Sequence, residues 1–163
     1  MSVHSSKQNR KQAVLVLGMH RSGTSAFSRA MNVLGFDVGR NMMPASEDNK
    51  KGYWEDLDIV DYNDKLLSQY YAAWDSPGIL RFLNRDDSSV VEEKNEIRAL
   101  ISNIFPNKTR IAIKDPRISL FSPIWRECLK EAGFTTKTIL CLRHPQAVAN
   151  SLNTRDRFSD LKS

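Results

Sequence analysis

Short apolar runs alternate along the chain with longer stretches in which apolar residues recur every three or four positions. Three runs are typical of strands buried in a parallel sheet: 13–17, 110–114 and 136–142. Five stretches are typical of helices: 25–34, 57–74, one holding Ile97 to Ile104, one holding Leu120 to Leu129, and one that begins at Pro145. Strands that alternate with helices predict an α/β fold, with an open parallel sheet flanked by helices in three layers.

The same pattern predicts several finer features of the fold. Residues 36–39 are expected to form a short edge strand, and residues 41–52 a mobile polar loop. Ser89 and Glu92 have the spacing of a capping box before the third helix. The first helix is expected to cover the sheet with an apolar side made of Ala26, Phe27, Ala30, Met31 and Leu34.

The stretch from Ala13 to Ala30 joins a strand, a glycine-bearing loop and a helix. In this order the loop amides and the positive end of the helix converge on one point, which predicts a site for a phosphate or sulfate. Gly18 and Gly23 have the spacing of a loop that binds nucleoside triphosphates, but Thr24 stands where that loop has lysine. The cation nearby is Arg21. Without that lysine, the chain lacks a main catalytic group for hydrolysis of ATP or GTP.

Composition narrows the class of protein. Apolar residues make up 40% of the chain and charged residues 26%, and the net charge of +5 favours an anionic ligand. No run of basic and aromatic residues favours nucleic acid, and no apolar run approaches the ~20 residues of a membrane span. Because no export signal is visible, a cytoplasmic location is expected. Cys128 and Cys141 are expected to be buried thiols in a reducing compartment, and the three histidines form no metal cluster.

Charged residues follow the predicted strands at the ends where parallel sheets bind ligands. Arg21, Asp115 and Arg143 each lie just beyond a strand, and Ser151 lies about two turns into the helix that follows Arg143. A guanidinium fork and a hydroxyl are suited to hold one phosphate. The alternative is that Arg143 pairs with an acidic neighbour and Ser151 is a small packing residue.

Three segments together resemble the PAPS-dependent sulfotransferases, an α/β family of nucleotide-kinase-like fold, in their bacterial-type branch. The segments are Gly18–Ser25, Lys114–Arg117 and Leu142–Pro145 with Ser151. The resemblance implies that 3′-phosphoadenosine 5′-phosphosulfate (PAPS) is the donor, that adenosine 3′,5′-bisphosphate (PAP) is the product, and that no metal is needed. It implies that one set of residues binds the nucleotide: His20, Arg21, Ser22, Gly23, Thr24, Ser25, Arg143 and Ser151.

The implied reaction moves a sulfuryl group from PAPS to a hydroxyl or amine of a glycan or small molecule. Arg21 and the amides of residues 22–25 are expected to stabilise charge on the leaving phosphate. The candidates for the general base are Glu55, Asp115 and His20, with Glu55 ranked first. The alternatives are that Glu55 caps a helix and that Asp115 pairs with Arg117 or Arg143. Strand alternation puts Lys114 and Asp115 on opposite faces, so that one of the two is expected to reach the ligand. Trp125 is expected in the core. For Trp54 both a place in the core and stacking on the adenine remain possible.

Two other functions remain open from the sequence. A kinase or NTPase would require magnesium and ATP, and a non-catalytic fragment would bind the nucleotide without transferring sulfate. We expect residues 1–12 to be a flexible tail and residues 13–163 to be a single sulfotransferase-like domain whose C-terminal part is missing, because such enzymes usually continue further. The sequence names no acceptor, and its three strands leave room for a second copy of the chain to complete the sheet.

Overall fold

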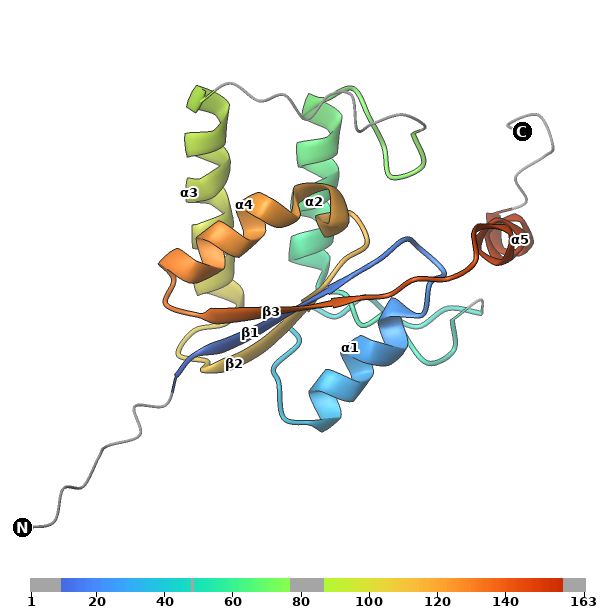
Figure 1. Cartoon of the computed structure of the whole chain (residues 1–163), viewed down its shortest axis with the longest axis horizontal. Coiled ribbons are helices and arrows are strands. Elements are labelled where there is room, and N and C mark those ends of the chain that lie inside the picture. The colour runs from blue at the N-terminus through green and yellow to red at the C-terminus, as the bar shows by residue number, and fades with distance from the viewer. Residues whose placement is uncertain (1–9, 48, 77–86, 157–163) are drawn as a thin grey trace, which may run out of the picture.

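The computed structural model describes residues 10–47, 49–76 and 87–156, and these have the predicted α/β architecture (Figure 1). Three parallel strands form the sheet in the order β2-β1-β3: β1 (Gln12–Leu17), β2 (Arg110–Lys114) and β3 (Thr135–Leu140). Gln12 at the start of β1 lies opposite Arg110 on one side and Thr135 on the other. The carboxyl ends of the three strands therefore meet at one edge of the sheet.

The described helices lie on both faces of the sheet and beyond one edge. They are α1 (Thr24–Val33), α2 (Leu57–Gln69), α3 (Asp87–Ile104), α4 (Ile118–Glu131) and α5 (Pro145–Asp156). Figure 1 shows α2, α3 and α4 over one face, α1 over the other, and α5 beyond the carboxyl end of β3. None of the described helices is both long and apolar enough to cross a bilayer.

Alternation along β1 divides the interior into two apolar clusters. Leu15 points into the larger cluster, which holds Phe121 and Trp125 of α4. Val14 and Val16 point into a smaller cluster on the α1 side. Trp125 is completely buried, as predicted for a core residue, and Cys128 and Cys141 are buried free thiols, also as predicted.

The predicted apolar side of α1 is wrong. Phe27 and Leu34 are 47% and 59% exposed, and the residues that α1 buries are Thr24 and Ser28. The Ser28 hydroxyl donates a hydrogen bond to the carbonyl of Trp54 at 3.2 Å. Small polar side chains on this face allow α1 to lie close to the segment that lines the candidate site. Of the five predicted residues, Met31 packs against the apolar cluster on this side.

Two of the predicted elements are shorter than expected. In place of a strand at 36–39, Asp37 makes a single bridge beside β2, donating to the carbonyl of Arg110 at 2.9 Å and accepting from the amide of Ala112 at 2.8 Å. Helix α2 ends at Gln69 and not at Trp74, and Tyr71 follows in the left-handed region with φ 53°. A residue in that region ends a helix because it turns the backbone away from the helical path.

The C-terminal end of β3 and the N-terminal end of α3 each lie two residues earlier in the chain than predicted. Strand β3 ends at Leu140, because its partner β1 ends at Leu17, whose carbonyl accepts the last hydrogen bond from the Cys141 amide at 2.8 Å. Helix α3 begins at Asp87, so that Ser89 lies inside the helix and is not its N-cap. The side chain of Ser89 falls outside the described part of the structure, as do residues 1–9 of the expected tail.

Candidate functional site

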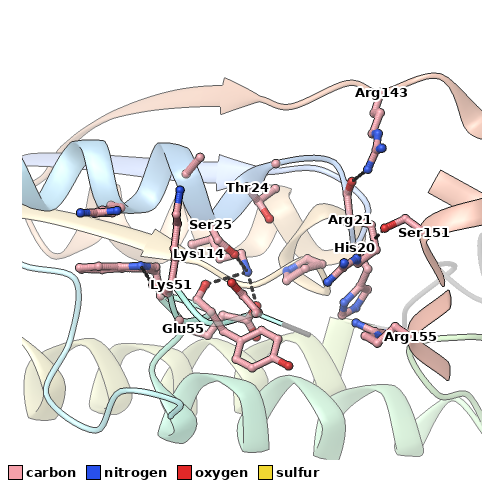
Figure 2. A pocket seen from close by; sticks show the side chains of 18 residues that line it. His20, Arg21, Thr24, Ser25, Lys51, Glu55, Lys114, Arg143, Ser151 and Arg155 are labelled. Carbon is pink, nitrogen blue, oxygen red and sulfur yellow. Dashed lines mark hydrogen bonds and ion pairs between the residues drawn. The ribbon is translucent and has the colours of Figure 1, made fainter. Parts of the chain in front are cut away.

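A cavity of about 500 Å³ lies at the carboxyl ends of the strands (Figure 2). Its walls come from the N-terminal turn of α1, the segment 49–55, the end of β2, and α5. Among the described residues, a single carboxylate side chain, that of Glu55, lines it. The cationic side chains that line it are those of Arg21, Arg29, Lys51, Lys114, Arg143 and Arg155. This excess of positive charge suits an anionic ligand.

The loop between β1 and α1 is shaped by two glycines. At Gly18, with φ 145°, a Cβ atom would come within 2.6 Å of the Cys141 carbonyl oxygen, and the Gly18 amide donates to the Ser119 hydroxyl at 2.9 Å. Gly23 precedes the helix with φ 89° and has no side chain to cap it. Within the described residues, no hydrogen-bond acceptor is assigned to the amides of Gly23, Thr24 and Ser25. An uncapped helix N-terminus at a cavity wall is suited to bind an anion.

The predicted phosphate-binding pair lies against this loop. The Arg143 guanidinium donates to the carbonyl oxygen of Arg21 at 2.8 Å, and Arg21 Nε donates to the Ser151 hydroxyl at 2.9 Å. Figure 2 shows Arg143 reaching down to Arg21, with Ser151 of α5 beside it. The loop, the end of β3 and α5 therefore form one connected wall. The alternative, in which Arg143 pairs with an acidic neighbour, would require a carboxylate beside its guanidinium. Among the described residues Arg143 has no such partner.

Lys114 and Glu55 form a buried ion pair in the middle of the cavity wall. Each is 4% exposed, and the ammonium of Lys114 also donates to the Tyr53 carbonyl at 3.2 Å and lies 3.5 Å from the Ser25 hydroxyl. Burial raises the pKa of Glu55, and the charge of Lys114 opposes that rise. Lys114 of β2 thus places a positive charge beside the first turn of α1. The loop itself supplies none at position 24, where Thr24 stands in place of the lysine of a loop that binds nucleoside triphosphates.

Asp115 directly follows β2, points to the opposite face of the sheet from Lys114 and does not line the cavity. It is completely buried and accepts hydrogen bonds from Asn63 at 2.7 Å and from the Arg117 guanidinium at 2.9 Å. Arg117 in turn pairs with Asp64 at 2.5 Å. Of these two neighbouring residues, Lys114 is therefore the one at the cavity, and Asp115, a predicted candidate base, lies in a network beneath the other face of the sheet.

His20 lines the cavity in an environment that disfavours its charged form. Burial, followed by the charges of Arg117, Lys114 and Arg155, lowers the pKa of His20 to about 3. Its ring lies 4.6 Å from that of Trp74, and its Nε2 is buried with no hydrogen-bond partner in the described structure. A neutral imidazole with so low a pKa is a weak proton acceptor, which leaves Glu55 as the better placed of the two candidate bases at the cavity.

Several lining residues extend the predicted set. All of the predicted nucleotide-binding residues except Ser22 line the cavity, and the amide of Ser22 is used inside the turn, where it donates to Met19 at 3.2 Å. Arg29 and Lys51 were not predicted. Arg29 has a sequence signal, because it stands one helical turn after Ser25 on the same face. No sequence signal marks Lys51, because its position at the cavity depends on how an irregular segment folds. Trp54, left open from the sequence, also lines the cavity.

Comparison of the chain with protein-family models, with curated proteins and with solved structures gives no match. Within the described residues, no group of three or more His, Cys, Asp and Glu side chains is arranged to hold a metal ion.

Proposed function

We propose that the protein binds a nucleotide with two anionic ends and transfers the sulfuryl group of PAPS to a hydroxyl or amine. The observation that supports this most is the meeting of two anion-binding arrangements at one cavity. The first is the uncapped N-terminus of α1, and the second is the wall made by Arg143, Arg21 and Ser151. PAPS has a phosphosulfate at its 5′ end and a phosphate at its 3′ side, which correspond to the two arrangements.

In the proposed reaction the bond between sulfur and the bridging phosphate oxygen breaks, and a bond from sulfur to the acceptor oxygen or nitrogen forms. Negative charge then grows on the 5′-phosphate of the departing PAP. Lys114, beside Ser25 in the first turn of α1, is placed to stabilise that charge together with the loop amides. Arg21 contributes a fixed positive charge near the 3′ side, since its Nε is directed at Ser151.

The proton of the acceptor goes to Glu55 in this scheme. Burial raises the pKa of Glu55, which makes its carboxylate a stronger base than an exposed one. Its ion pair with Lys114 has two consequences. The pair keeps the carboxylate charged, and Lys114 must turn from Glu55 toward the donor as the nucleotide enters.

A second candidate function is binding of the bisphosphate without transfer. The observation that favours it is the same ion pair, because a base held by Lys114 in a buried contact is withheld from an acceptor. A magnesium-dependent kinase or NTPase is the less favoured alternative, since Thr24 replaces the lysine of its loop.

Calorimetry with PAP, 5′-AMP and Mg-ATP tests the nucleotide assignment. We expect PAP to bind at least about tenfold more tightly than 5′-AMP, because only PAP places a phosphate at Arg143 and Ser151. The variant Arg143→Gln should remove this preference, whereas Arg126→Gln, which removes an exposed charge on α4, should keep it. Equal affinity of the native chain for PAP and 5′-AMP contradicts the assignment, and preference for Mg-ATP favours the kinase.

Transfer assays with radiolabelled donor then separate the two remaining functions. An enzyme transfers label to acceptors bearing hydroxyl or amine groups, and Glu55→Gln lowers the rate while leaving the affinity for PAP within about threefold. A binding protein retains the affinity for PAP and transfers no label.

A further inference from the structure

Two cations of the cavity differ from the rest in having no assigned partner. Lys114 pairs with Glu55, Arg155 pairs with Asp156, and Arg143 donates to a carbonyl. Arg29 and Lys51 also line the cavity and are exposed, but no ion pair or side-chain hydrogen bond of either is found among the described residues. Unpaired cations at the wall of a cavity are available to a ligand.

Both residues line the same cavity as Glu55, and the local backbone fixes the position of each. Arg29 stands four residues after Ser25 on α1, and side chains at that spacing lie on the same face of a helix. Lys51 lies in a segment fixed from two sides: its carbonyl accepts from the Trp54 indole at 2.8 Å, and the Gly52 amide donates to Asn49 at 2.9 Å. Trp54 in turn is tied to α1 through Ser28. The position of Lys51 relative to α1 is therefore set by the fold.

Lys51 lies apart from the wall assigned to the 3′-phosphate, and Arg29 lines the same cavity one turn further along α1 than Ser25. In Figure 2, Lys51 is on one side of the Lys114–Glu55 pair, and Arg21, Ser151 and Arg155 are on the other. A nucleotide that spans from Ser151 to the first turn of α1 occupies the second side. The first side, next to the candidate base Glu55, is left for the acceptor.

From this arrangement we infer that the acceptor is anionic: it carries a carboxylate or a phosphate or sulfate ester beside the hydroxyl that receives the sulfuryl group. The inference rests on the proposed function, because that function assigns Glu55 to the acceptor. The guanidinium of Arg29 offers a planar fork that suits such groups, and the ammonium of Lys51 offers a second positive charge. Together they hold the anionic group away from Glu55, whose own charge repels it, and leave a neutral hydroxyl to approach the base.

The test measures binding of acceptor probes to the full chain, by calorimetry or ligand-observed NMR, with and without saturating PAP. The probes are methyl glucuronide, glucose 6-phosphate and the uncharged methyl glucoside. We expect the charged probes to bind about fivefold more tightly than the glucoside, since one exposed charge pair contributes up to about that factor. The two charged probes distinguish a carboxylate from a phosphate as the favoured group.

Paired substitutions assign the effect to the two cations. The double variant R29Q/K51Q should bind all three probes within about twofold of one another, and its affinity for PAP should stay within about twofold of the native value. The double variant R126Q/K137Q removes the same charges from exposed positions on α4 and β3, outside the cavity, and should keep the preference. Thermal unfolding checks that each variant is folded.

Three results overturn the inference: equal or undetectable binding of all probes to the native chain, a preference that survives in R29Q/K51Q, or a large loss of PAP affinity in that variant, which would assign the cations to the donor. The proposed function fails separately. If the native chain does not bind PAP, the probes titrated into the free chain still show whether Arg29 and Lys51 select an anion.

Discussion

Two consecutive residues at the end of β2 lead to two buried ion pairs on opposite faces of the sheet. Lys114 points toward α1 and pairs with Glu55 at the cavity. Asp115 points toward α2 and α4 and pairs with Arg117 at 2.9 Å. All four side chains are at most 9% exposed. Burial of charge therefore does not separate a candidate functional pair from a structural one.

Access to the cavity and the length of the further contacts do separate them. The oxygens of Asp115 accept from Asn63 and from both the backbone amide and the guanidinium of Arg117. Lys114 instead faces a cavity that holds further polar groups, and its contacts with the Tyr53 carbonyl and the Ser25 hydroxyl are long, at 3.2 and 3.5 Å. A ligand can replace such contacts, whereas it cannot reach Asp115. The first pair is suited to change partners and the second to hold the fold.

The largest expected effect is on the structural pair. We expect Asp115→Ala to lower the free energy of unfolding by about 3–5 kcal/mol, because the buried Asn63 amide loses its acceptor and the buried Arg117 guanidinium keeps only Asp64 as a charged partner. Urea denaturation measures the loss. Among molecules that remain folded, affinity for PAP should stay unchanged, since Asp115 does not line the cavity. A variant with native stability and no PAP binding would reverse the assignment of the two pairs.

The sequence predicted Lys114 and Asp115 at the end of a strand, with Arg117 as one of two arginines that could pair with Asp115, but it did not predict which distant side chains contact them. Strand periodicity was enough to put Lys114 and Asp115 on opposite faces. The partner of Asp115 that α2 supplies, Asn63, and the partner of Lys114, Glu55, depend on how distant segments pack. No local pattern records such packing.

The element types could likewise be predicted, whereas the face of α1 could not. Three strands and five helices follow from periodicity, because burial of a strand or helix face imposes it. The apolar residues of α1 misled the prediction, because this helix covers a cavity and a small cluster, and it buries Thr24 and Ser28 in place of Phe27 and Leu34. A helix beside a polar site departs from the rule that the apolar side faces inward.

A smaller loss of stability is expected at the cavity pair. Lys114→Met should lower the free energy of unfolding by about 2 kcal/mol, because it leaves the buried Glu55 without its charged partner. The same variant should weaken PAP binding by at least about tenfold, since a cation beside the first turn of α1 is lost. The double variant K114M/E55Q should regain most of the stability and none of the affinity. If Lys114→Met binds PAP normally, Lys114 is structural like Asp115.

A still smaller effect concerns His20, whose pKa is lowered first by burial and then by the charges of Arg117 and Lys114, one from each pair. The unfolded chain binds a proton at His20 near pH 6.5, and the folded chain binds it only near pH 3. Between these values the unfolded state holds more protons, so stability falls as the pH falls. From pH 7 to pH 5 we expect His20 to contribute a loss of about 1 kcal/mol, allowing for its partial exposure.

The measurement for His20 is the difference between native chain and His20→Gln in urea denaturation at pH 7 and pH 5. The variant should lose less stability than the native chain on acidification, because it has no proton to bind at position 20. Carboxylates such as Glu55, whose pKa is raised, titrate in both proteins and cancel in the difference. Equal losses in the two proteins would mean that His20 is not held neutral.

The smallest expected loss of stability is at an exposed ion pair, which can be compared with the two buried pairs. Arg98 of α3 and Glu131 of α4 lie 2.5 Å apart, closer than Asp115 and Arg117, but their side chains are 42% and 37% exposed. Glu131→Gln should lower the free energy of unfolding by about 0.5 kcal/mol, because water screens both charges in either state. The loss should shrink further in 1 M salt, where screening acts within about 3 Å. A loss as large as that of Asp115→Ala would mean that the short contact, and not burial, determines what these pairs contribute.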